Sequence, residues 1–143
     1  MQTLKNEMLT IQVSEHGAEL QSIRKDDYEY LWQGNPEYWG RRSPVLFPIV
    51  GSVWEKCFRV DGKVYEMGQH GFARDMDFEL TSASETELWY KLESDENTLK
   101  AYPWPFVLEI GYRLEGNSVK VLWKVTNPGE TEMYFQIGAH PAF

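Results

Sequence analysis

A length of 143 residues is within the usual range of one domain, and 22 acidic against 14 basic residues give a formal net charge of −8. Such a charge would repel both a nucleic-acid backbone and an anionic membrane surface. No apolar run is long enough to span a bilayer, and charged residues interrupt the first ten positions where a signal peptide needs an apolar core. The single cysteine, Cys57, excludes an intrachain disulfide and fits a reducing compartment. We therefore expect a cytoplasmic protein with no nucleic-acid or membrane partner.

The first half of the chain is predicted to consist of short strands. Windows of alternating apolar and polar residues are typical of half-buried strands, and turn-forming residues separate them. Asp61-Gly62 is a tight-hairpin signal, because both residues tolerate the positive φ that such turns require. The strands expected here are residues 9–13, 18–23, 29–32, 47–53, 57–60 and 63–67.

The second half repeats this pattern. Leu88, Tyr90 and Leu92 alternate with polar neighbours, and Gly116-Asn117 is a second hairpin signal. Only residues 95–102, which precede Pro103, resemble a short helix. The strands expected here are residues 77–84, 87–92, 107–114, 119–125 and 133–138. Many short strands with almost no helix predict an all-β protein, built as an antiparallel sandwich or barrel.

Three histidines are candidates for chemistry. His16 lies in a polar turn, so a solvated surface residue is the preferred interpretation. His70 begins a motif that brings imidazole, guanidinium and carboxylate together with Arg74 and Asp75, beside a glycine that permits close approach of a ligand. A ligand site and simple ion pairing at a sheet edge explain this motif equally well. His140 follows the last expected strand, and the apolar end of the chain indicates an element cut short.

The segment 39–51 is a further candidate. Arg41 and Arg42 precede an apolar stretch that contains Pro44 and Pro48, which favours a sheet edge or a concave wall. The donors of a guanidinium suit sugar hydroxyls or a phosphate, although a charged pair beside a buried strand is often only a solvated rim. Aromatic residues make up 15% of the chain and suit either a β-rich core or platforms for flat sugar faces.

Several classes of chemistry lack their sequence signatures. No cysteine and histidine spacing matches a zinc site. The chain also has no glycine-rich phosphate loop, no dinucleotide-binding motif and no nucleophile elbow. We therefore expect no metal, no cofactor, no nucleotide chemistry and no serine hydrolysis.

Five motifs, taken in order, resemble the aldose 1-epimerase (galactose mutarotase-like) family, and they are most similar to its LacX-type branch. The motifs are residues 31–39, 43–51, 70–74, 102–106 and 138–143. The resemblance implies an antiparallel β-supersandwich roughly twice as long as this chain. Residues 1–143 are therefore expected to form a single partial domain, the N-terminal half of a C-terminally truncated sandwich.

The resemblance also implies a reaction. Family members interconvert the α and β anomers of a hexose: a carboxylate takes the proton of the C1 hydroxyl while a histidine protonates the ring oxygen. By position, His140 is similar to this general acid, and His70 to a second histidine that contacts the substrate. Arg74 and one of Arg41 and Arg42, preferably Arg42, resemble the arginines that bind sugar hydroxyls or a 6-phosphate.

One family residue has no counterpart here. The resemblance places the catalytic glutamate beyond residue 143, while Glu130 and Glu132 are interpreted as solvated charges. The chain by itself is therefore predicted to be catalytically incomplete and to expose strand edges that favour self-association or a complementing second chain. The alternatives are a non-catalytic carbohydrate-binding module, a mutarotase of hexose 6-phosphates, and a purely structural β-sandwich fragment.

Overall fold

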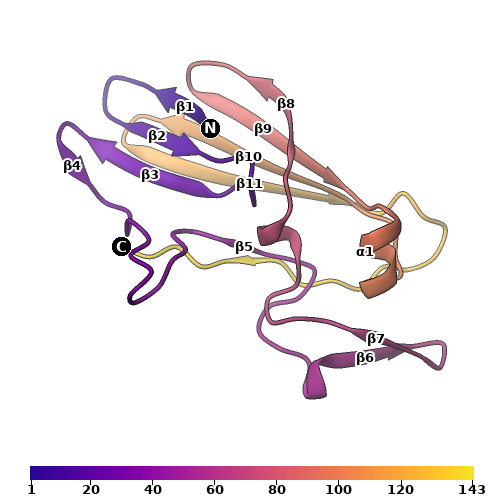
Figure 1. The fold of residues 1–143 in the computed structure, drawn as a ribbon. Coiled ribbons are helices and arrows are strands. Elements are labelled where there is room, and N and C mark those ends of the chain that lie inside the picture. Colours follow the sequence, from indigo (N-terminus) through magenta and orange to yellow (C-terminus); the bar gives the residue numbers. More distant parts are fainter.

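Two four-stranded antiparallel sheets face each other in the computed structural model, which describes residues 1–143 (Figure 1). One sheet has the order β1-β2-β3-β4 and the other the order β11-β10-β9-β8. The first comprises β1 (Gln2–Lys5), β2 (Thr10–Val13), β3 (Leu20–Lys25) and β4 (Tyr28–Glu29). The second comprises β8 (Glu79–Ala83), β9 (Glu87–Glu93), β10 (Val107–Glu115) and β11 (Ser118–Thr126). The predicted antiparallel β-sandwich is thus confirmed.

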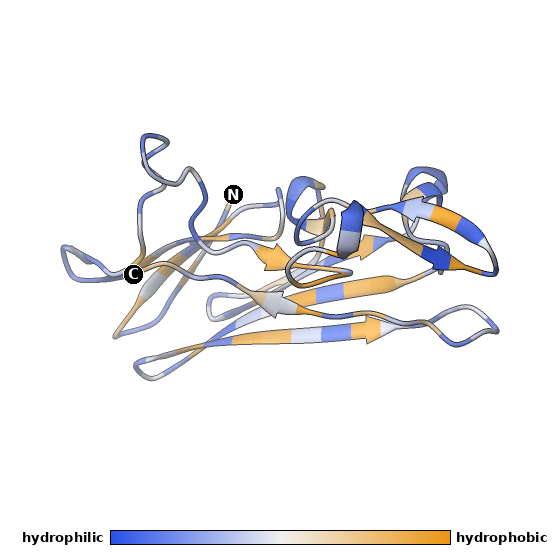
Figure 2. Ribbon diagram, turned by 90° about the horizontal axis from the view of Figure 1, so that it is seen from below, coloured by the Kyte–Doolittle hydropathy of each residue, from blue (hydrophilic) through white to orange (hydrophobic).

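The core between the sheets follows from the alternation of the strands. Leu88, Tyr90 and Leu92 of β9 are buried, as predicted, and Tyr90 pairs with the buried Ile110 of β10. Figure 2 shows hydrophobic residues concentrated on the strands and hydrophilic residues in the turns. The hydroxyl of Tyr112 crosses to the other layer and donates to the carbonyl of Ala18 at 2.8 Å, so a buried polar group is also satisfied there.

Both predicted hairpins form. Asp61 and Gly62 have φ values of 48° and 79° and join β6 (Cys57–Val60) to β7 (Lys63–Glu66). Gly116 has a φ of 55° in the turn between β10 and β11. The predicted helix is α1 (Glu96–Ala101), which begins at an Asp95 capping box and ends at Tyr102. The structure therefore contains no helix able to cross a bilayer.

Two strand predictions are wrong in extent. In place of residues 47–53 and 133–138, the structure has the two-residue strands β5 (Val45–Leu46) and β12 (Gly138–Ala139), which pair with each other. Pro44 and Pro48 flank β5 and have no N–H to donate, so a longer ladder cannot form there. β12 is short because its partner is short.

Smaller differences occur near the N-terminus and at turns. The structure has β1, which was not predicted, and β4 covers Tyr28–Glu29 in place of residues 29–32. β3 starts at Leu20, later than predicted, because Ala18 has a left-handed φ of 45°. Two 3₁₀ turns, η1 (Trp54–Lys56) and η2 (Ala73–Asp75), lie on the connections.

Candidate active site

The backbone of residues 44–51 holds the C-terminal end of the chain on one of its sides. Gly138 pairs with Leu46, Ala139 pairs with Val45, and the N–H of His140 donates to the carbonyl of Pro44 at 3.1 Å. Figure 1 shows β5 and β12 running side by side across the middle of the molecule. His140 is therefore fixed at its backbone, directly after β12.

The same segment holds the His70 motif on its other side. The carbonyl of Phe47 accepts from the N–H groups of Phe72, at 3.0 Å, and Ala73, at 3.2 Å. The N–H of His70 donates to the carbonyl of Gly51 at 2.7 Å. His70 and His140, seventy residues apart in the sequence, thus attach to one stretch of backbone.

Gly71 allows the His70 motif to lie close to the 44–51 backbone. Its φ is +72°, and a Cβ atom built on it would lie 2.2 Å from the carbonyl oxygen of Phe47. His70 also has a positive φ, of 65°, which is uncommon for a residue with a side chain. Only glycine at position 71 lets the chain pass this near to the 44–51 segment.

His140 has an exposed imidazole beside an aromatic wall. Its ring centroid lies 5.1 Å from that of Trp39, with the two planes at 89°. The indole N–H of Trp32 donates to the carbonyl of Trp39 at 2.8 Å, which fixes the loop that carries the wall. Sequence reasoning did not select Trp39 as a site residue, although it ends the first family motif and lies two residues before Arg41.

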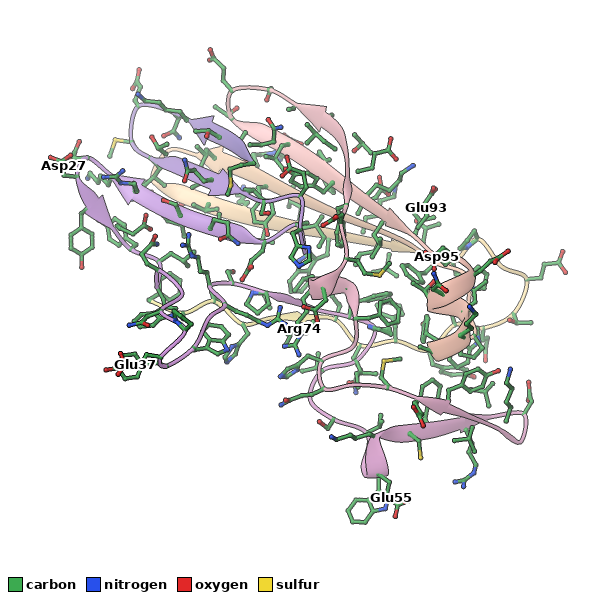
Figure 3. The ribbon with its side chains drawn as sticks, viewed as in Figure 1. Asp27, Glu37, Glu55, Arg74, Glu93 and Asp95 are labelled. Carbon is green, nitrogen blue, oxygen red and sulfur yellow. The ribbon has the colours of Figure 1, made fainter.

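Arg74 projects from η2 beside the β5 and β12 segments, whereas Glu37, on a loop, and Glu55, in η1, lie at the periphery (Figure 3). Its Nη2 donates to the carbonyl of Gln69 at 2.8 Å, while its buried Nε has no hydrogen-bond partner. Burial, followed by the charge of Arg41, lowers the pKa of the Arg74 guanidinium, and the Asp75 carboxylate opposes this change.

The two arginines at positions 41 and 42 have different surroundings. Arg41 Nη2 donates to the Asp75 carboxylate at 2.7 Å, and its charge acts on Arg74. Arg42 Nη1 donates to the carbonyl of Gln21 on β3 at 2.8 Å, so this guanidinium anchors its loop to the sheet. A sugar contact by Arg42 stays a prediction.

His70 has a defined partner for one ring nitrogen. The N–H of Gly51 donates to His70 Nδ1 at 2.9 Å. Burial lowers the pKa of His70, and the charges of Arg74 and His140 lower it further. His70 therefore lies within electrostatic range of Arg74 and of His140.

No carboxylate forms a hydrogen bond or an ion pair with His70 or His140 in the structure. His16 is the histidine that has such a partner, with Nδ1 at 2.8 Å from Asp77 Oδ1. Its side chain is exposed, in agreement with the interpretation as a surface residue. The candidate site in residues 1–143 thus contains histidines and arginines, but no carboxylate is paired with His70 or His140 as a general base would be.

The fold and the arrangement of the candidate site identify the structural class of the protein. The facing sheets and the histidines grouped around a proline-flanked segment match galactose mutarotase-like folds. A galactose mutarotase related enzyme from Lactobacillus acidophilus has a TM-score of 0.96 and 41% identity, over 98% of this chain and 47% of that protein. A galactose mutarotase-like protein from Lactobacillus casei has a TM-score of 0.95 and 37% identity, over 99% and 49% of the respective chains.

The chain belongs to the aldose 1-epimerase family, whose model matches residues 1–143. It is 40% identical over 148 aligned residues to the chromosomal LacX protein of Lactococcus lactis subsp. lactis, and the match covers 98% of this chain and 49% of LacX. The plasmid-encoded LacX protein matches equally well. The chain spans about half the length of these curated relatives, and the family resemblance expected from the five motifs is confirmed.

Proposed function

We propose that the protein is a mutarotase-like isomerase that interconverts the α and β anomers of a hexose. In this scheme His140 donates a proton to the ring oxygen, a carboxylate takes the proton of the C1 hydroxyl, and the bond between C1 and the ring oxygen breaks to leave a C1 carbonyl. Rotation about C1–C2 and the reverse proton transfers close the ring on the other face. His70 and Arg74 are the proposed contacts to the sugar, with Arg41 as the second arginine because Arg42 is bound to Gln21, and the cytoplasm is the proposed location.

One observation carries this proposal. The backbone of residues 44–51 attaches His140 on one side and the His70–Ala73 stretch on the other. To open a sugar ring, a proton donor and hydrogen-bond donors must surround that same ring. The shared attachment therefore supports a common site for His140 and His70. Membership of the aldose 1-epimerase family supports the choice of reaction.

Polarimetry tests the proposal. Residues 1–143, joined to the half of LacX that they do not match, should speed the relaxation of freshly dissolved α-glucose or α-galactose. Residues 1–143 by themselves should leave this relaxation unchanged, because no carboxylate is paired with His140. A joined protein, shown to be folded, that has no effect on any common hexose or hexose phosphate would contradict the isomerase.

A non-catalytic carbohydrate-binding module is the second candidate, and the aromatic side chain of Trp39 beside His140 favours it. Such a module would bind the sugar through Trp39 and the arginines without interconverting its anomers. Titration calorimetry separates the two functions in the joined protein. Sugar binding that persists in a His140→Ala variant, with no turnover in the unmodified protein, would support the module.

The arginines allow a matched test of the sugar contact and of a phosphate. We expect Arg41→Ala to weaken binding of a hexose 6-phosphate by about 10- to 100-fold, because Arg41 and Arg74 both contact the Asp75 carboxylate and a charge-assisted hydrogen bond contributes roughly 1.5–3 kcal/mol. Arg42→Ala removes the bond to Gln21 and should lower the melting temperature. Calorimetry with glucose and glucose 6-phosphate, together with thermal melts, compares the two variants. Loss of binding only in Arg42→Ala would instead support the sequence-based preference.

The edge strand β11 presents an apolar face. Val121 and Trp123 pair with buried residues of β10, yet they are 44% and 41% exposed. With Pro141 and Phe143 they line a groove of about 150 Å³. We propose that this face is covered by a strand-rich polypeptide equivalent to the half of LacX that the chain does not match, because the relatives are about twice as long.

Analytical ultracentrifugation tests whether that half of LacX binds to the β11 face. Residues 1–143 mixed with that half of LacX should form a one-to-one complex, and Trp123→Lys should weaken it at least tenfold. Val64→Lys is the control, since Val64 is also exposed but lies on β7, away from the groove. A homodimer of residues 1–143 that Trp123→Lys dissolves would show that a second copy is the occupant.

A further inference from the structure

His70 is bound to Gly51 by two reciprocal hydrogen bonds. The backbone N–H of His70 donates to the carbonyl of Gly51 at 2.7 Å, and the backbone N–H of Gly51 donates to His70 Nδ1 at 2.9 Å. A backbone N–H can only donate, so Nδ1 must carry a free lone pair. The proton of the neutral ring is therefore on Nε2.

The surroundings oppose the other protonation states. A proton on Nδ1 would face the N–H of Gly51, and it would lie in the field of Arg74 and His140, the charged and titratable groups that act on His70. The loop cannot easily turn away, because Gly71 forms a parallel bridge to Phe47 and the N–H of Phe72 bonds to the same residue. Burial and these charges lower the pKa of His70, in agreement with a neutral ring.

We propose that His70 is a fixed neutral donor, whose Nε2–H binds an acceptor oxygen of the sugar, and that it takes no part in proton transfer. His140 differs, because no hydrogen bond holds either of its ring nitrogens and only its backbone is fixed. A ring in this state can orient an oxygen lone pair of the sugar, and proton transfer stays with His140, as in the proposed function. The identity of the acceptor as a sugar oxygen rests on the proposed function, whereas the tautomer does not.

Long-range ¹H–¹⁵N correlation spectra of the imidazoles test the tautomer in residues 1–143 without any ligand. The expected spectrum of His70 at neutral pH has a pyridine-type Nδ1 and a pyrrole-type Nε2. Its signals are assigned by their absence in His70→Asn, and the spectrum of His16 provides an internal comparison. A pyrrole-type Nδ1, or an imidazolium at neutral pH, would overturn the proposal.

Two variants test the role in the joined protein. In His70→Asn the amide oxygen can replace Nδ1 as the acceptor for Gly51 while the outer donor is lost, so sugar affinity should fall about tenfold with little change in melting temperature. In His70→Gln the amide N–H can reach the position of Nε2 while the Gly51 N–H loses its acceptor. The melting temperature should then fall, with affinity within about threefold of the unmodified protein.

The outcomes separate the two proposals. Unchanged affinity in a folded His70→Asn variant would overturn the donor role. If the expected tautomer is found and no hexose or hexose phosphate binds to the joined protein, the tautomer stands and the proposed function fails.

Discussion

Replacing His140 by glutamine is expected to lower the turnover of the joined protein by about 10²–10⁴-fold, which is the range that a positioned general acid contributes. Glutamine retains a hydrogen-bond donor of similar size but cannot release a proton at neutral pH. Because His140 is exposed and its ring has no hydrogen bond, the variant should fold normally. Substrate binding should change little, so the loss should be found in kcat and not in KM.

His16→Gln is the matched control. His16 is also an exposed histidine, but its ring is paired with Asp77, and no hydrogen bond joins it to the 44–51 segment. Polarimetric relaxation rates should be the same for this variant and the unmodified protein. If His140→Gln keeps full turnover, the general acid is another residue and the assignment by family position is incorrect.

A Gly71→Ala substitution is expected to destabilise the fold by at least about 3 kcal/mol, which is a large fraction of the stability of a small domain. The positive φ of Gly71 would cost an alanine about 1–2 kcal/mol, and its Cβ would lie 2.2 Å from the Phe47 carbonyl oxygen. Backbone must move to relieve that contact, and the bonds from Phe72 and Ala73 to Phe47 would be lost with it. Urea denaturation followed by tryptophan fluorescence measures the change.

Gly62→Ala isolates the conformational part of this cost. Gly62 has a similar φ, of +79°, but a Cβ there would meet nothing within 4 Å. It should therefore lose only about 1–2 kcal/mol. Equal losses in the two variants would mean that the contact with Phe47 is relieved without cost, and the close approach of the His70 motif would then have no structural importance.

The agreement between sequence and structure is best where local rules decide. Asp61, Gly62 and Gly116 adopt the positive φ that their tight turns require, so local preference suffices there. Asp95 starts α1 with its own side chain. The prediction fails around Pro44 and Pro48, where apolar character indicated a long strand but missing N–H groups limit the ladder to β5.

The candidate site was found from motifs, but its arrangement was not. His70, Arg74 and His140 were selected by their place in the family motifs, and the structure attaches His70 and His140 to the same 44–51 backbone. The motifs did not show that Arg41 is the arginine whose charge acts on Arg74 while Arg42 bonds to Gln21. Neither did they show Trp39 against His140.

The amino-acid sequence by itself determined the alternation that buries one face of β9 and β10, the two tight turns and the capped helix, because each depends on neighbours a few residues away. Only the tertiary structure decided that Leu46 pairs with Gly138 and that Gly51 holds the ring of His70. Those contacts join segments that are far apart in the chain, so they depend on how the sheets and loops pack and not on the preferences of neighbouring residues.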